Sequence, residues 1–214
     1  MFVKDKMTKN VITVSPTTNV LDALELMRKH KIRRLPVLDG TKLVGIVTEM
    51  DLIRVSPSPA TSLSVYELNY LLAKMTVKEA MTTNPIVVSP DATLEEAALL
   101  MRENQIGGLP VVHEGELVGI ITETNIFDAF IESMGLRRAG IRVALEVEDH
   151  PGVLAELTGL IYKTGINIIS LATFTGLPEG RASIVVRLAV DSADPLIKEL
   201  EAHGYSVAHV SNLG

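Results

Sequence analysis

The segment LPVLDGTKLVGIVTEMD occupies residues 35–51, and LPVVHEGELVGIITETN occupies residues 109–125. The two segments align without a gap at an offset of 74 residues, and the match continues on the N-terminal side. About 21 of the 47 positions from Met7 to Ile53 have an identical counterpart in the later stretch. An ungapped match of this length indicates an internal duplication. The chain therefore begins with two copies of one structural unit.

Each copy has the pattern of a short strand, a helix, two strands and a second helix. In the first copy, Val11–Val14 reads as the short strand, and the apolar residues after Asn19 follow the 3.6-residue period of a helix. Leu35–Leu38 and Leu43–Val47 are the next two strands, joined by a turn, and the second helix follows Thr48. The predicted unit is therefore β-α-β-β-α.

Side-chain caps are expected at the start of the first helix in both copies. Asn19 with Asp22, and Thr93 with Glu96, have the spacing of an N-cap and its reciprocal partner. A unit of about 50 residues is too small to be comfortably stable alone. We therefore expect the two copies to pack sheet against sheet, which would leave two equivalent clefts.

A different pattern follows residue 140. Alternating apolar residues predict a strand over Ile141–Val147, and the elements after it complete the β-α-β-β-α-β order of a ferredoxin-like fold. These further elements are expected at Val153–Thr164, Ile166–Thr175, Ala182–Val190, Asp194–His203 and Tyr205–Val210. The predicted fold class of the whole chain is therefore α+β.

The patterns divide the chain into two repeats, two linkers and a C-terminal domain. The linker between the repeats contains the run SPSPATS at residues 56–62, which is typical of a loop, followed by a helical pattern. The predicted boundaries are 1–55 for the first repeat, 56–75 for the linker loop and helix, 76–134 for the second repeat, 135–140 for the second linker and 141–214 for the last domain.

The composition excludes several classes of function. The 214 residues include 20 Lys+Arg and 26 Asp+Glu, and the net charge of -6 argues against nucleic acid as the main partner. The chain has no cysteine, and therefore no disulfide and no cysteine-ligated metal. Its first ten residues lack the apolar region of a secretory signal, and no apolar run reaches the roughly 18 residues of a membrane span. We expect a cytoplasmic protein that binds neither nucleic acid nor membranes.

The sequence carries no signature of a known catalytic site. It lacks the nucleophile elbow, the phosphate-binding P-loop, the dinucleotide fingerprint and the HExxH zinc motif. The five histidines are scattered, and no pair of carboxylates stands out as an acid and base couple. We predict that the chain has no catalytic residue and no metal ligand.

The junction between the second hairpin strand and the following helix can hold a ligand. Thr48 and the helix N-terminal amides suit a phosphate, and Asp51 can accept two hydroxyl groups of a ribose. Thr48-x-x-Asp51 is equally the pattern of a capping box, which contributes about 1 kcal/mol to helix stability. The spacing alone supports both interpretations. In the second copy Thr122 matches, but Asn125 replaces the carboxylate and favours capping.

The residues before the hairpin differ between the copies. Arg33 and Arg34 stand in the first copy, where Gly107 and Gly108 stand in the second. Arginines at this place can bind phosphates, and glycines allow close approach of a backbone. The neighbouring basic run at residues 28–31 is also consistent with a solvated helix end that is favoured by the helix dipole.

Residues 1–130 resemble two CBS domains that form a Bateman module. The resemblance rests on the duplicated Leu-Pro-Val and Leu-Val-Gly-Ile motifs and on the Thr-x-x-Asp motif of the first copy, in this order and spacing. It implies clefts between the copies that bind AMP, ADP, ATP, S-adenosylmethionine or sometimes NAD, with Thr48 at the phosphate and Asp51 at the ribose. Together, the resemblance and the residue chemistry described above assign further nucleotide-binding residues: Ile12, Thr13, Arg33, Arg34, Pro36 and Val37 in the first copy, and Gly107, Gly108, Pro110, Thr122 and Asn125 in the second.

Residues 141–214 are similar to an ACT domain. The motif Asp149-His150-Pro151-Gly152-Val153-Leu154, followed by Gly165-Ile166-Asn167-Ile168, carries the similarity. In ACT domains that bind amino acids, the ligand lies between two such units, so the resemblance implies a homodimer. The implied amino-acid-binding residues are Asp149, His150, Gly152, Val153, Leu154, Asn167 and Ile168.

Two functional classes are consistent with these features. The first is a non-catalytic regulatory protein that senses an adenine nucleotide and acts on a regulated enzyme. Its last domain serves dimerisation and is a candidate for amino-acid binding. The second is a structural partner subunit with vestigial clefts that acts by protein–protein contact. The order of domains over the whole chain resembles the acetoin-utilisation proteins, a group whose own function is loosely defined.

Overall fold

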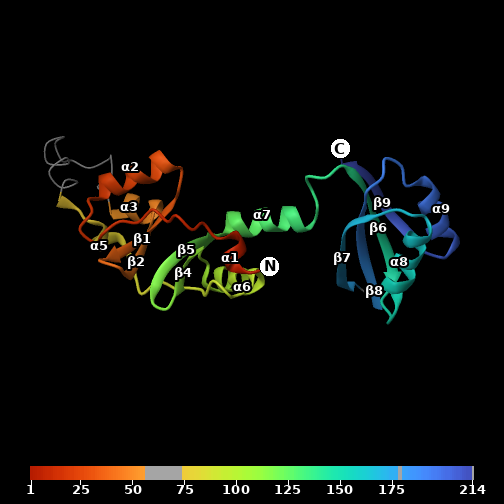
Figure 1. The fold of residues 1–214 in the computed structure, drawn as a ribbon, viewed down its shortest axis with the longest axis horizontal. Coiled ribbons are helices and arrows are strands. Elements are labelled where there is room, and N and C mark those ends of the chain that lie inside the picture. Colours follow the sequence, from red (N-terminus) through yellow and green to blue (C-terminus); the bar gives the residue numbers. More distant parts are fainter. Residues whose placement is uncertain (56–73, 178–179, 214) are drawn as a thin grey trace. The chain divides into compact units, whose positions relative to one another are not determined.

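The computed structural model describes residues 1–55, 74–177 and 180–213 (Figure 1). These residues form two compact units, Met1–Ile126 and Phe127–Gly214, and each unit is considered by itself. The linker predicted at 56–75 lies outside the described residues, apart from its last two positions. No helix in the described ranges is long and apolar enough to cross a membrane.

The duplication in the sequence is a duplication in structure. Each copy contains a helix, an antiparallel hairpin and a second helix, and both hairpins shift register at the same place, Val37/Leu38 and Val111/Val112. The elements are α2 (Val20–His30), β1 (Arg34–Asp39), β2 (Lys42–Thr48) and α3 (Glu49–Val55) in the first copy, and α6 (Leu94–Asn104), β4 (Gly108–His113), β5 (Glu116–Thr122) and α7 (Glu123–Ser133) in the second. The predicted helices and hairpins are confirmed.

The two helix starts are capped in different ways. The Thr93 hydroxyl accepts the Glu96 N–H at 3.1 Å, and the Glu96 carboxylate accepts the Thr93 N–H at 2.7 Å, so the expected capping box forms. The Thr93 N–H, and after it the Thr93 hydroxyl, donate to the Glu96 carboxylate and hold its pKa below the usual value. Asn19 caps α2 by accepting the Leu21 N–H at 2.8 Å, and not through a reciprocal bond with Asp22.

The strand predicted at Val11–Val14 does not form. Only Val14 makes a bridge, to Val37 in parallel orientation, and the equivalent Val88 bridges Val111. The Val11 N–H bonds back to the Lys9 carbonyl at 3.1 Å, so the chain turns there and cannot continue a ladder. The apolar residues of this segment instead pack as an irregular stretch against the core.

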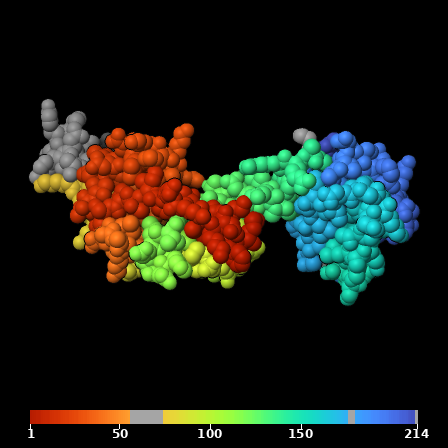
Figure 2. Space-filling model, viewed as in Figure 1, coloured from red at the N-terminus to blue at the C-terminus, as the bar shows by residue number. Residues whose placement is uncertain are grey.

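The first residues of the chain belong structurally to the second copy. The short helix α1 (Val3–Lys6) lies beside the start of α6, where the Val3 N–H donates to the Ala92 carbonyl at 2.9 Å. Thr8 then exchanges two backbone hydrogen bonds with Ile120 of β5, at 2.9 and 3.0 Å. In Figure 2 the red N-terminal atoms lie against the yellow and green atoms of the second copy.

The second copy returns the same contacts to the first. Helix α5 (Val77–Ala80) places fully buried Val77 in the core formed by α2, β1 and β2. The two-residue strand β3 (Thr82–Thr83) pairs with Gly45 and Ile46 of β2. Each copy is thus closed by the opening segment of the other.

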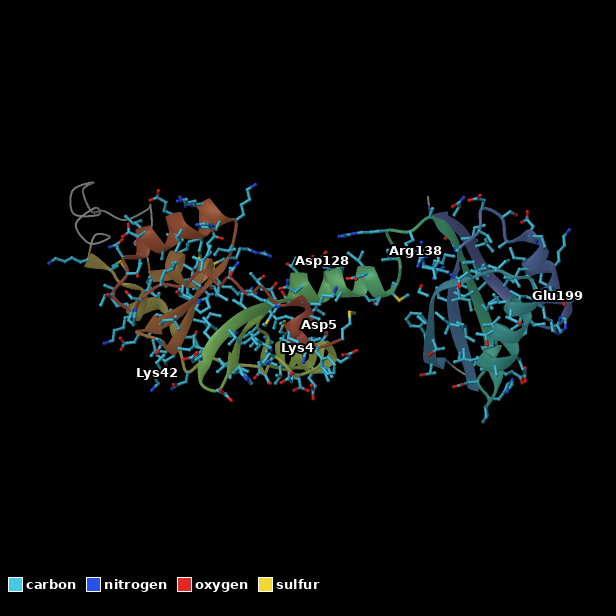
Figure 3. The ribbon with its side chains drawn as sticks, viewed as in Figure 1. Lys4, Asp5, Lys42, Asp128, Arg138 and Glu199 are labelled. Atoms are coloured by element: carbon cyan, nitrogen blue, oxygen red, sulfur yellow. The ribbon has the colours of Figure 1, made fainter. Side chains whose placement is uncertain are left out.

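The two hairpins meet differently from the expected stacking of sheets. They join edge to edge through one residue pair, Lys42↔Glu116, which gives the strand order β1-β2-β5-β4 with β3 beside β2. Lys42 stands at the tip of its hairpin in Figure 3. The exchanged segments, rather than a broad sheet interface, therefore make many of the backbone links between the copies.

The second unit has the predicted ferredoxin-like order. Its antiparallel sheet has the strand order β7-β8-β6-β9, and both helices cover one face (Figure 1). The core lies between that face and the helices. The elements are β6 (Gly140–Glu148), α8 (Val153–Lys163), β7 (Ile168–Leu177), β8 (Arg181–Leu188), α9 (Asp194–Ala202) and β9 (Ser206–Leu213).

The exchange makes a prediction about stability. Val3 is fully buried although it lies three residues from the N-terminus, so V3A should lower the free energy of unfolding by about 2 kcal/mol through lost burial and a cavity. The matched variant V87A, at a valine that is 43% exposed, should change it by less than about 0.5 kcal/mol. Urea unfolding measures both. Equal effects of the two substitutions would contradict the exchanged arrangement.

Candidate functional site

Thr48 and Asp51 form a closed capping box at the start of α3. The Asp51 carboxylate accepts the Thr48 N–H at 3.0 Å and the Thr48 hydroxyl at 2.6 Å. The Thr48 hydroxyl in turn accepts the Asp51 N–H at 3.3 Å. Both residues are half-buried. The capping interpretation of this motif is therefore realised, and its oxygens stay within reach of solvent.

Thr122 and Asn125 make the same set of bonds in the second copy. The Asn125 side-chain oxygen accepts the Thr122 N–H at 2.9 Å and the Thr122 hydroxyl at 2.8 Å. The Asn125 N–H completes the box with the Thr122 hydroxyl at 3.4 Å. An amide oxygen thus replaces a carboxylate oxygen without loss of geometry. The difference between the two copies is one of charge.

A cavity of about 340 Å³ opens at the Thr122–Asn125 junction. Its walls come from both copies, because the exchanged segment around Thr8 runs along β5. The cavity contains six of the residues that the sequence predicted for nucleotide binding: Ile12, Arg33, Arg34, Gly107, Thr122 and Asn125. The sequence assigned these residues to separate clefts, and the structure gathers them into one.

The cavity has a divided chemistry. Val11, Ile12, Ile32 and Ile120 supply apolar surface, and the basic residues Lys31, Arg33 and Arg34 cluster in the segment after α2. Sequence reasoning missed its remaining walls, which are Thr8, Asn10, Val11, Lys31, Ile32, Ile120, Glu123 and Thr124. Lys31 had a signal, since it is the last residue of the basic run at residues 28–31, which ends α2. Its left-handed backbone (φ 55°) ends the helix there and begins the segment that lines the cavity.

Arg34 is wedged against the glycine pair of the second copy. Its guanidinium donates to the Gly107 carbonyl. A Cβ atom on Gly107 would lie 2.6 Å from Nη2 of Arg34 and 2.8 Å from Oε2 of Glu123, so a larger residue would require these side chains to move. Gly108 is similarly pressed, with the Ile121 carbonyl 3.1 Å from an added Cβ. Burial lowers the pKa of Arg34, and Glu123 partly opposes that effect.

The second copy carries no cation at the positions that correspond to Lys31, Arg33 and Arg34. At the offset of 74 residues, Gln105 is the counterpart of Lys31, and Gly107 and Gly108 are the counterparts of Arg33 and Arg34. Asp51 of the first copy corresponds to Asn125 of the second. The two capping boxes therefore share one geometry but differ in charge, because Asp51 is a carboxylate and Asn125 is an amide.

The other predicted nucleotide-binding residues have different surroundings. Thr13 lines a separate cavity of about 530 Å³ beside α2. Pro36, Val37 and Pro110 are buried within β1 and β4. The carbonyls of Pro36 and Pro110 each accept a backbone N–H at 3.1 Å, from Val14 and Val88 respectively. These hydrogen bonds hold the segments that contain Val14 and Val88 against β1 and β4.

The predicted amino-acid site divides into two places. Asp149, His150, Gly152, Val153 and Leu154 line a cavity of about 230 Å³, together with Thr173 and Thr175 of β7. Asn167 and Ile168 lie at the far end of the sheet, because Ile168 pairs with Leu188 whereas the loop follows Glu148, the partner of Arg181. Within one chain the two groups do not meet. Gly152 has φ 100° at the N-cap of α8, a conformation that favours glycine.

A larger cavity, of about 680 Å³, lies on the other side of the same loop. Its lining includes the carboxylates of Glu146, Glu148, Asp149 and Glu156. Tyr205 also lines it, and burial, aided by Glu156, raises the pKa of its phenol. The described residues contain no cluster of three or more metal-binding side chains.

Comparison with family models decides the identity of the two units. The model described as CBS domain matches residues 3–58 and 77–132. The chain belongs to the CBS domain family. The model described as ACT domain matches residues 141–210, so an ACT domain follows the CBS pair.

One relative of the CBS pair is a segment of an enzyme. Inosine-5'-monophosphate dehydrogenase of Korarchaeum cryptofilum is 42% identical over 120 residues, which make up 56% of this chain. The chain spans only 22% of that enzyme's length. The similarity therefore concerns the CBS segment and carries no activity to this chain.

Three solved structures resemble the CBS pair. CBSX2, solved in complex with AMP, is 38% identical with a TM-score of 0.51 over 61% of this chain and 96% of its own. The CBS pair of protein MJ0100, solved with 5'-methylthioadenosine and S-adenosyl-L-methionine, is 32% identical with a TM-score of 0.50 over 61% and 95%. AcuB of Vibrio cholerae, assigned to acetoin utilization, is 34% identical with a TM-score of 0.53 over 64% and 95%.

The repeated capping boxes predict the effect of exchanging one CBS motif for the other. D51N should leave the free energy of unfolding within about 0.5 kcal/mol of the wild type, because Asn125 makes the same bonds. D51A should lower it by about 1 kcal/mol, because the cap is lost. Urea unfolding at neutral pH compares them. A D51N variant as unstable as D51A would show that the carboxylate charge, and not the cap, stabilises α3.

Proposed function

We propose that the CBS pair binds an anionic adenine nucleotide, of the class of AMP, ADP and ATP, in the cavity of about 340 Å³ at Thr122 and Asn125. The observation that carries the proposal is the composition of this cavity, in which apolar, hydroxyl and cationic groups from both copies converge. Its volume lies at the lower end of the range of small-molecule pockets, which begins near about 300 Å³.

The chemistry of the cavity matches the parts of a nucleotide. The apolar side chains of Ile12, Ile32 and Ile120 suit the faces of a purine. The Thr122 hydroxyl and the Asn125 amide suit the ribose hydroxyls. Lys31 and Arg33 are exposed and suit phosphate oxygens, whereas Arg34 is occupied by the Gly107 carbonyl.

Charge favours a nucleotide over S-adenosylmethionine at this cavity. Lys31, Arg33 and Arg34 outnumber the single lining carboxylate, Glu123. A phosphate group is therefore attracted, while a sulfonium cation is repelled. The AMP complex of CBSX2 supports this ligand class, and the complex of the MJ0100 pair shows that a CBS pair of similar fold takes adenosyl ligands as well.

The regulatory step follows from the shared walls of the cavity. A nucleotide that contacts both copies favours the arrangement of the pair that binds it more tightly. We infer that this preference is passed to the ACT domain and that ACT domains of two copies associate, with an amino acid as a possible second ligand at Asp149–Leu154. The regulated partner is then an enzyme bound by contact.

The rival function is a partner subunit whose CBS clefts hold no ligand. One observation favours it, namely that both capping boxes are satisfied by their own hydrogen bonds. On this account Thr48, Asp51, Thr122 and Asn125 only stabilise helices. Binding measurements separate the two functions.

Isothermal titration of the full chain with AMP, ATP and S-adenosylmethionine tests the proposal. We expect micromolar binding of AMP or ATP, about -8 kcal/mol, and weaker binding of S-adenosylmethionine. R33Q should weaken nucleotide binding about tenfold or more, because a charged hydrogen bond contributes about 1.5–3 kcal/mol. The matched variant K29Q removes a cation from α2 that does not line the cavity, and it should bind as the wild type does.

The outcomes are distinct. Loss of affinity in R33Q with retention in K29Q supports the cavity as the nucleotide site. Absence of heat from every adenine ligand with folded protein favours the partner subunit. Equal loss in both variants would show general electrostatic attraction without a defined site.

A further inference from the structure

A row of two arginines and two serines crosses the open face of the ACT sheet. Arg142 of β6 pairs with Arg187 of β8, and the row ends with Ser170 of β7 and Ser211 of β9. The neighbouring residues Val143 and Val186 point into the core under the helices. Because side chains alternate along a strand, the four polar residues lie on the face that no helix covers.

Arg187 is buried with most of its donors unsatisfied. It is 1% exposed, and Nη2 donates to the Arg138 carbonyl at 2.7 Å. Its Nε and Nη1 atoms have no hydrogen-bond partner among the described residues. Arg138 is labelled on the connector before β6 in Figure 3. A buried guanidinium with one partner is unfavourable, because it loses hydration that nothing replaces.

Arg142 adds a second uncompensated charge beside the first. Directly opposite like charges on neighbouring strands are destabilising. Within the described residues, the side chain of Arg142 makes no hydrogen bond or ion pair. The acidic residue further along the same face, Glu146, is bound by Arg181 at 3.2 Å. The two guanidinium groups therefore lack a carboxylate from this part of the chain.

We propose that Arg142 and Arg187 bind an oxyanion, a phosphate or a carboxylate, on the open face of the ACT sheet. Guanidinium groups bind both oxyanions through paired hydrogen bonds. Arg142 is half-buried and remains in contact with solvent, and Arg187 on the neighbouring strand has two nitrogen atoms without a partner in the described part of the chain. The Ser170 hydroxyl donates to the Met134 carbonyl at 2.9 Å and holds the connector beside the site.

This site is separate from the predicted amino-acid loop. Arg142 lies near the start of β6, whereas Asp149 follows the end of that strand. The site also contains no residue of the CBS cavity, so the proposal of oxyanion binding is tested independently of the proposed nucleotide binding. An oxyanion at this position would sit against the connector between α7 and β6 and would stabilise the connector's attachment to the sheet.

Thermal unfolding of the full chain tests the site, with sodium phosphate and sodium acetate compared with sodium chloride at equal ionic strength. We expect at least one oxyanion to raise the wild-type midpoint by about 2–5 °C over chloride, and the larger shift identifies the preferred oxyanion. R142Q should abolish the shift. R181Q, on the same face but away from the pair, and R33Q, in the CBS cavity, should retain it.

A second variant tests the proposal through the direction in which its unfolding temperature changes. In chloride, R187M should unfold at the same or a higher temperature than the wild type, because it removes a buried charge without its partner, and it should not respond to oxyanions. A marked fall in its midpoint in chloride would make Arg187 a clamp for the connector and overturn the proposal. Equal oxyanion shifts in wild type and R142Q, or none in either, would overturn it too.

Discussion

The exchange of opening segments between the two CBS copies is the constraint on which the first unit depends. Val77 completes the core of the first copy, and the segment of Val3 and Thr8 completes the backbone contacts of the second. Neither copy is closed by its own chain. Val3 and Val77 are each buried in this way by a chain segment that crosses from one copy to the other. The course of these segments also determines which residues line the cavity.

Comparison of the two copies distinguishes the features that maintain the fold from the side chains that line the proposed ligand cavity. Register, hairpin irregularity and capping geometry are the same in both copies, although Asp51 became Asn125. The side chains that differ are those before the hairpin. Arg33 and Arg34 on one side, and Gly107 and Gly108 on the other, fit each other as a wedge and its recess. Their asymmetry places Arg33 and Arg34 in the cavity that Thr122 and Asn125 line.

Much of the fold could be predicted because the relevant signals are local. The repeat, the helix periods and the Thr93 cap each depend on residues within one element or turn. The prediction of a strand at Val11–Val14 was wrong. Residues with a strand-like pattern form a strand only when another strand pairs with them, and here the chain turns at Lys9. The exchange was invisible, since nothing near Val3 indicates which copy it enters.

Six of the residues that line the cavity were singled out from the sequence, but their grouping into one cavity was not predicted. Ile12 and Arg33 were associated with Thr48, whereas the cavity groups them with Thr122 and Asn125, although the Arg33 carbonyl also accepts the Glu49 N–H at 3.0 Å. Sequence separation is a poor guide in a fold with exchanged segments. Asn167 was joined to Asp149 on the family pattern, and strand register separates the two within one chain.

The most direct measurement is a crystal structure of the full chain grown with AMP. The account predicts one nucleotide between Ile12 and Thr122, with its phosphate near Lys31 and Arg33 and its ribose at Asn125. A nucleotide bound instead at Thr48 and Asp51, with the cavity at Asn125 empty, would contradict it.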